Sequence, residues 1–177
     1  MSILIKNIIR FALFILVQVY ILFQVPPLHE YVVPYLYFLY ILWLPFKMPR
    51  ISLMLLGFVF GFSLDYFTHT PGLHAAPCIL IAYVRPFLIN LLIPQEGTEL
   101  NYASPSVVSM GWAPYATYVT VLTLLHHAFL IFLEWLHFGS FIYFILKLGS
   151  SAAVSLLLIF ITELLFFRKE RFRTNTA

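Results

Sequence analysis

The sequence predicts an all-α membrane protein with six transmembrane helices and both termini in the cytoplasm. First, the chain of 177 residues is 62% hydrophobic and only 10% charged, whereas soluble domains are about 25% charged. Second, its charge-free stretches are apolar on all sides, unlike the alternating strands of a membrane β-barrel. Third, its basic residues cluster beside the apolar runs, as orientation signals do. This composition excludes a soluble domain, a disordered tail and a nucleic-acid-binding protein.

We predict a single membrane domain over 1–177. One crossing needs about 20 apolar residues, so six crossings use about 120 residues and leave only short loops and tails. We place the helices near 8–25, 32–46, 50–67, 73–93, 113–134 and 141–167. The first resembles a signal peptide, but it ends in Val25-Pro26-Pro27 without a small-residue cleavage site, so we expect an uncleaved span. The second and third are short, and each is alternatively a re-entrant or half-buried segment.

Basic residues indicate the orientation, because they collect in the cytoplasmic loops of membrane proteins. With the N-terminus inside, eight of them lie on the cytoplasmic side and none in the outer loops near 26–31, 66–72 and 135–140. The eight are Lys6, Arg10, Lys47, Arg50, Arg168, Lys169, Arg171 and Arg173. Lys147, in the outer part of the last span, is the exception. We expect the tail from Arg168 to Arg173 to fix the orientation and to contact anionic lipid.

Ionisable residues inside a membrane are costly and are therefore functional candidates. They are Asp65, Arg85, Glu134, Lys147, Glu163, His69, His74, His126, His127 and His137. Intramembrane aspartyl proteases need two carboxylates that share a proton, but Asp65 is the only aspartate. The His-Glu-x-x-His zinc motif is absent, and the single Cys78 provides no cysteine zinc site. Because His126 and His127 point about 100° apart on a helix, we expect a neighbouring helix or water, not a metal shared with Glu134, to satisfy them.

The densest signal is the third span with the turn that follows it. Its members are Gly57, Gly61, Ser63, Asp65, Pro71, Gly72 and His74. Gly57 and Gly61 form Gly-x-x-x-Gly, which lets another helix approach closely, and Asp65 extends that stripe by one turn. A tight turn after the helix would let Asp65, His69 and His74 share hydrogen bonds near the outer surface.

The remaining candidates have structural interpretations. Ser63 follows Gly61-Phe62 but lacks the second glycine of a nucleophile elbow, so we expect it to pack and to bond its own helix. Arg85 and Glu163 lie at a similar depth, and pairing them would cost less than two separate charges. Alternatively, Arg85 extends to lipid head groups. The sequence thus predicts no enzyme, no bound metal and no cofactor.

With this motif, the sequence resembles the MreD family of rod shape-determining membrane proteins. The resemblance is carried by Gly57-x3-Gly61-x3-Asp65, then Thr70-Pro71-Gly72-Leu73-His74-Ala75, then an apolar helix to Arg85-Pro86. Further similarities are Pro94-Gln95-Glu96-Gly97, Ser104-Pro105-Ser106, His126-His127 and the basic tail. The resemblance covers nearly the whole chain in length, span number and orientation, and its specific part is 57–86. The short, tyrosine-rich second and third spans depart from the family pattern.

The resemblance implies a multi-pass protein of the bacterial cytoplasmic (inner) membrane without enzymatic activity. Members work in sidewall elongation with the bitopic protein MreC, the actin-like MreB, and the peptidoglycan synthase RodA with its transpeptidase. The family is thought to be similar in fold to the six-helix substrate-binding subunits of energy-coupling-factor vitamin transporters. Two hypotheses follow: a scaffold that packs on the single helix of an MreC-like partner, or a vitamin-type binding or transport subunit. In the first, the small-residue stripe Gly57, Gly61 and Ser63 and the Asp65/His74 turn are the partner surface or the pivot that shapes it.

Overall fold

The computed structural model describes residues 3–24, 31–93, 103–136 and 140–165, and the regular secondary structure in these ranges is all helical. The long helices are α1 (Ile3–Tyr20), α3 (Arg50–Thr68), α4 (Ala75–Leu92), α6 (Trp112–Trp135) and α7 (Phe141–Leu165). The short ones are η1 (Leu22–Gln24), α2 (Leu39–Leu42) and α5 (Val107–Met110). Five helical spans, the first running through η1, are long and apolar enough to cross a membrane. The chain thus has the architecture of a multi-pass membrane protein.

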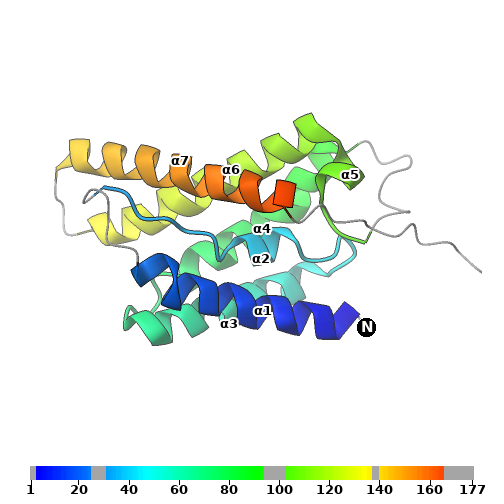
Figure 1. Cartoon of the computed structure of the whole chain (residues 1–177), viewed down its shortest axis with the longest axis horizontal. Coiled ribbons are helices and arrows are strands. Elements are labelled where there is room, and N and C mark those ends of the chain that lie inside the picture. Colours follow the sequence, from blue (N-terminus) through cyan, green and yellow to red (C-terminus); the bar gives the residue numbers. More distant parts are fainter. Residues whose placement is uncertain (1–2, 25–30, 94–102, 137–139, 166–177) are drawn as a thin grey trace, which may run out of the picture.

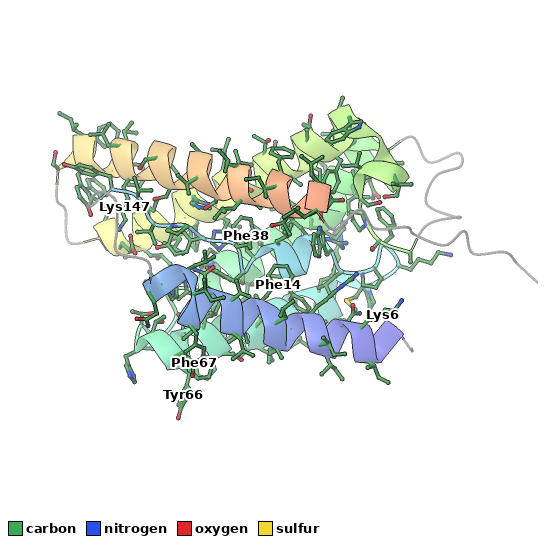
Figure 2. All side chains as sticks on the ribbon, viewed as in Figure 1. Lys6, Phe14, Phe38, Tyr66, Phe67 and Lys147 are labelled. Atoms are coloured by element: carbon green, nitrogen blue, oxygen red, sulfur yellow. The ribbon has the colours of Figure 1, made fainter. Side chains whose placement is uncertain are left out.

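The long helices form one bundle, in which α1 packs on α3, α3 on α4, α4 on α6 and α6 on α7. Residues 31–46, which we call the buried segment, run along the bundle between α1 and α7 (Figure 1). Because this segment runs back along the bundle, α1 and α3 point in the same direction (Figure 1). Lys6 and Lys147 mark opposite ends of the bundle, and Phe38 of the buried segment lies between them (Figure 2).

The outside of the bundle is apolar, as a hydrocarbon environment requires. Each long helix exposes large hydrophobic side chains, among them Leu13, Leu55, Phe87, Phe132 and Leu157. Exposure of this kind over every helix would be unfavourable in water. It supports the assignment of these helices to a bilayer.

The spanning helix expected over 32–46 is not formed. Residues 32–36 have no regular secondary structure, and the only α-helical turn there is α2. Pro34 supplies no backbone N–H and disfavours the helical conformation of Val33 before it. The segment is nevertheless central, since Tyr37, Phe38 and α2 are at most 4% exposed. The half-buried alternative does not describe it either, because the centre of the segment is enclosed by the bundle.

The other expected helices are observed, with boundaries shifted by a few residues. The third is a full-length helix of 19 residues, so its re-entrant alternative is not observed. The connection between the helices expected over 73–93 and 113–134 contains the short α5. Outside the described residues lie the basic tail, His137, Val25-Pro26-Pro27, the expected helix end at 166–167 and the first part of that connection, 94–102.

Candidate functional site

Asp65, in the last turns of α3, accepts three backbone hydrogen bonds at the start of α4. Its Oδ1 accepts from the N–H of His74 at 2.7 Å, and its Oδ2 accepts from Gly72 and Ala75 at 3.0 Å each. The first N–H groups of a helix lack partners within it, and the helix dipole favours a negative charge there. With 2% of its surface exposed, Asp65 is a cap that one helix supplies to the next.

The turn between α3 and α4 depends on two residues with positive φ. His69 has φ 57° and Gly72 has φ 89°. The backbone N–H groups of His69 and Thr70 both return to the carbonyl oxygen of Asp65. The hydrogen bonds expected among Asp65, His69 and His74 are therefore made through backbone N–H groups. Pro71 and Gly72 form the tight turn that the sequence predicted.

The glycine stripe contacts α4 of the same chain. A Cβ atom added to Gly61 would lie 2.5 Å from Cα of Ala75, and one added to Gly57 would lie 3.0 Å from the carbonyl oxygen of Cys78. The two backbones therefore approach as closely as the sequence indicated, but the second helix belongs to this chain. The stripe is therefore a contact between two helices of this chain. Ser63 lies outside this contact and donates to the carbonyl of Val59 at 2.7 Å, as expected.

His74 and His126 meet on one hydroxyl of the buried segment. The Tyr37 hydroxyl lies 3.1 Å from Nδ1 of His74 and 2.8 Å from Nε2 of His126. The ring of Phe38 stacks on His126 with 4.4 Å between centroids. Burial lowers the pKa of His74 to about 4, against the opposing effect of the Asp65 charge. A chain of hydrogen bonds thus joins α4, the buried segment and α6.

His127 points away from its neighbour to a different helix. Its Nδ1 lies 2.9 Å from the carbonyl of Thr123, and its Nε2 lies 3.0 Å from Oγ of Ser155 in α7. A neighbouring helix therefore satisfies this histidine, as expected. Glu134 instead forms an ion pair with Lys147. Within the described part of the chain, no three His, Cys, Asp or Glu side chains are grouped so that they could hold a metal ion.

Polar side chains of α1 and α7 hold the backbone of the buried segment. Gln18 accepts from the N–H groups of Leu36 and Tyr37 at 2.9 and 3.2 Å, and it donates to the carbonyl of Pro34 at 3.0 Å. In α7, Ser151 accepts from the N–H of Val33 at 3.1 Å, and Ser155 accepts from that of Tyr35 at 3.0 Å. Lipid offers no such partners, so non-helical backbone at membrane depth depends on them.

Arg85 and Glu163 each bond a tyrosine of α6 in place of the direct ion pair that the sequence suggested. Nε of Arg85 donates to the Tyr118 hydroxyl at 3.0 Å, and Nη2 donates to the carbonyl of Leu44. Glu163 accepts from the Tyr115 hydroxyl at 2.9 Å. Arg85 is fully buried, so the alternative of contact with lipid head groups does not describe it. Both residues lie within the bundle near the end of the buried segment.

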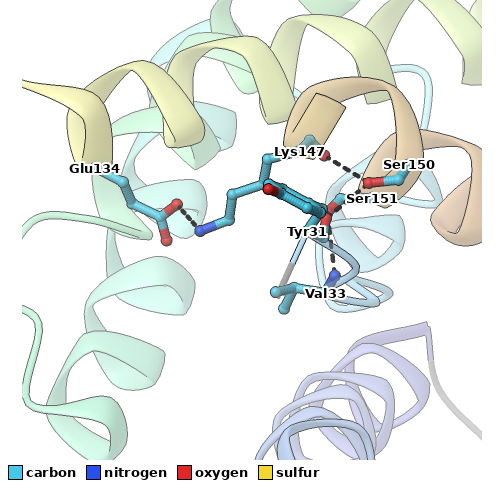
Figure 3. A network of polar contacts seen from close by, with 6 residues as sticks. All are labelled: Tyr31, Val33, Glu134, Lys147, Ser150 and Ser151. Carbon is cyan, nitrogen blue, oxygen red and sulfur yellow. Dashed lines mark hydrogen bonds and ion pairs between the residues drawn. The ribbon is translucent and has the colours of Figure 1, made fainter. Parts of the chain in front are cut away.

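Lys147 forms an ion pair with Glu134 between α7 and α6 (Figure 3). Its Nζ lies 2.6 Å from Oε2 of Glu134. Next to this pair, the Ser150 and Ser151 hydroxyls donate to the carbonyl of Tyr31, where the buried segment begins. The pair neutralises the one basic residue that departs from the predicted charge asymmetry.

The neutral polar residues that organise the interior were not among the candidates predicted from the sequence. They are Gln18, Tyr37, Tyr115, Tyr118, Ser151 and Ser155. The available signal was polar side chains within apolar helices, which need internal partners in a membrane. A search restricted to ionisable groups does not find them.

The chain matches no protein-family model, no curated protein and no solved structure. What the protein does is therefore a proposal, built on the residues and their contacts.

Proposed function

We propose that this chain is a non-catalytic scaffold of the bacterial cytoplasmic membrane, similar to MreD. It packs on the single membrane helix of an MreC-like protein and, through it, serves MreB, RodA and the associated transpeptidase during sidewall elongation. Rod shape is maintained because the scaffold keeps these proteins together. The finer topology belongs to this proposal: six crossings, both termini inside and a basic tail on anionic lipid.

The observation that carries the proposal is the corner between α3 and α4. Gly57, Gly61, Asp65, Gly72 and His74 are among the residues that carry the resemblance, and all of them contribute to this corner. The glycines let α3 approach α4, and the carboxylate caps α4. Because the motif positions two helices relative to each other, it supports a scaffold, whose function depends on how its helices are arranged.

The interior offers a second argument, against a vitamin-type subunit. A small-molecule site needs a concave pocket with converging polar groups. Here the centre of the bundle is occupied by the chain itself, since Tyr37 and Phe38 are fully buried. The Tyr37 hydroxyl is already bonded to two histidines. The fold analogy with vitamin-binding subunits alone is weak evidence for function.

The partner helix has to bind the outer surface of the bundle, because α4 covers the glycine stripe. The exposed side of α3 carries Phe58 and Phe62, whose rings stack with 5.6 Å between centroids. We place the partner contact there, with the stripe as the pivot that sets the position of α3.

Depletion of the protein tests the function. We expect rod-shaped cells to become round while vitamin uptake stays unchanged. Normal cell shape with lost uptake would replace the scaffold by the transport subunit. Co-purification in detergent then tests the partner: Phe62→Ala should reduce recovery of the bitopic protein without lowering the melting temperature. Unchanged recovery would move the contact to another helix.

A further inference from the structure

We propose that the hydrogen-bond chain His74–Tyr37–His126 is an acid-sensitive latch, in which protonation of His74 releases the adjacent part of the buried segment. The latch joins three elements at one hydroxyl: α4 through His74, the buried segment through Tyr37 and α6 through His126.

The direction of the hydrogen bonds follows from one unpartnered atom. Nδ1 of His126 is buried and has no hydrogen-bond partner among the residues that the structure describes, and buried N–H groups without an acceptor are rare in proteins. Nδ1 is therefore the bare nitrogen of the neutral ring, and the proton is on Nε2. It follows that Nε2 of His126 donates to the Tyr37 hydroxyl, and that this hydroxyl donates to the bare Nδ1 of His74.

Protonation of His74 reverses this arrangement. When Nδ1 of His74 takes a proton from water, two N–H groups face the oxygen of Tyr37 and the hydroxyl proton loses its acceptor. Tyr37 can then satisfy its hydroxyl only by moving. His74 is the member that water reaches first, because it directly follows the turn that contains the exposed Pro71 and Gly72.

The surroundings of His74 keep it neutral while the latch is closed. The titratable groups around it are Asp65 from α3, Tyr35 and Tyr37 from the buried segment and His126 from α6, and the Cys78 thiol of α4 interacts with Tyr37. Asp65 favours a proton on His74, but burial outweighs it and lowers the pKa of His74 from 6.5 to about 4. The open state binds more protons between these values, so opening becomes easier as the pH falls through that range.

Amide hydrogen exchange in the full chain, held in lipid nanodiscs, tests the latch. The test variant is His74→Asn, because the Asn side-chain oxygen replaces Nδ1 as an acceptor, cannot titrate and suits a helix N-cap. At each pH, the exchange rate of peptides covering 33–38 is divided by the rate in the variant, which cancels the intrinsic pH dependence. We expect this ratio to rise by up to about tenfold per pH unit from pH 6.5 to pH 4.

Two further variants keep the test decisive. His69→Asn is the matched control, since His69 is exposed and Asn tolerates its positive φ; it should follow the wild type. In Tyr37→Phe, the amides of residues 33–38 should exchange faster, and their exchange should lose the pH dependence although His74 is retained. This variant replaces His74→Asn in the test if His74→Asn fails to fold. A ratio independent of pH, or equal pH dependence in Tyr37→Phe, would overturn the latch. So would nitrogen-15 NMR showing the proton of His126 on Nδ1 at neutral pH.

Discussion

Asp65 shows how much a single buried acceptor contributes where lipid offers no replacement. Asp65→Ala removes the acceptor of the buried N–H groups of His74 and Ala75. Since each unsatisfied buried group costs about 1–3 kcal/mol, we expect the two groups together to cost about 2–6 kcal/mol. A melting curve in detergent measures it.

Glu134→Ala is the matched control for this prediction. Glu134 is also a paired carboxylate, but its side chain is 27% exposed, and exposed ion pairs contribute only about 0–1 kcal/mol. Its effect on stability and on rod shape should therefore be smaller than that of Asp65→Ala. Equal tolerance of both substitutions would remove the case for the Asp65 cap.

Two serines provide a second residue-scale comparison. Ser155 joins the backbone of Tyr35 to the ring of His127, whereas Ser63 bonds only its own helix among the described residues. We expect Ser155→Ala to cost about 1–3 kcal/mol, and Ser63→Ala to stay within about 0.5 kcal/mol. Chemical unfolding of the two variants side by side measures the difference. A tolerated Ser155→Ala would mean that the buried segment does not depend on α7.

At the scale of elements, the contact between α3 and α4 should be the least tolerant of added volume. Gly61→Ala places a methyl group 2.5 Å from the backbone of Ala75, and overpacking of this kind costs about 1–3 kcal/mol. Gly149→Ala is the control, because its Cβ meets nothing within 4 Å and alanine favours helix. In thermal unfolding, the melting temperature of Gly61→Ala should be clearly lower than that of Gly149→Ala. Equal melting temperatures would show that α3 can shift freely on α4.

The larger Gly61→Leu substitution extends the same reasoning to function. We expect reduced co-purification of the partner with normal membrane insertion, because α3 is displaced and its outer surface moves. A partner helix that packs directly on the glycine stripe would give the same result, because leucine would block its approach. Crosslinking distinguishes the two explanations: a crosslink between α3 and α4 should be lost in Gly61→Leu but retained if the partner, and not α4, fills the stripe.

The long helices could be predicted from the sequence because each carries its own signal, a run of apolar residues long enough to cross a bilayer. The buried segment could not, since its run of apolar and tyrosine residues has the composition of a short span. Its conformation is decided by hydrogen bonds from residues 118 and 120 positions away, Ser151 and Ser155. Similarly, the glycine stripe indicated a close approach but not that the approaching helix was α4.

For the whole molecule, the decisive question is whether the buried segment counts as a crossing. Two basic groups, Lys6 with Arg10 and Lys47 with Arg50, flank the first span and the buried segment. In the proposed topology, the positive-inside rule puts both groups on the cytoplasmic side, which requires the chain to return between them. The path of the buried segment along the bundle supplies that return (Figure 1).

Single cysteines in a Cys78→Ala background test this topology with a maleimide that does not cross membranes. We expect Lys6→Cys and Lys47→Cys to react only after the membrane is opened, and Pro71→Cys, in the exposed turn after α3, to react in intact cells. If the segment turned back halfway, the positions at Lys6 and Lys47 would lie on opposite sides. The reactivities of these two cysteines would then differ, and five crossings would replace six.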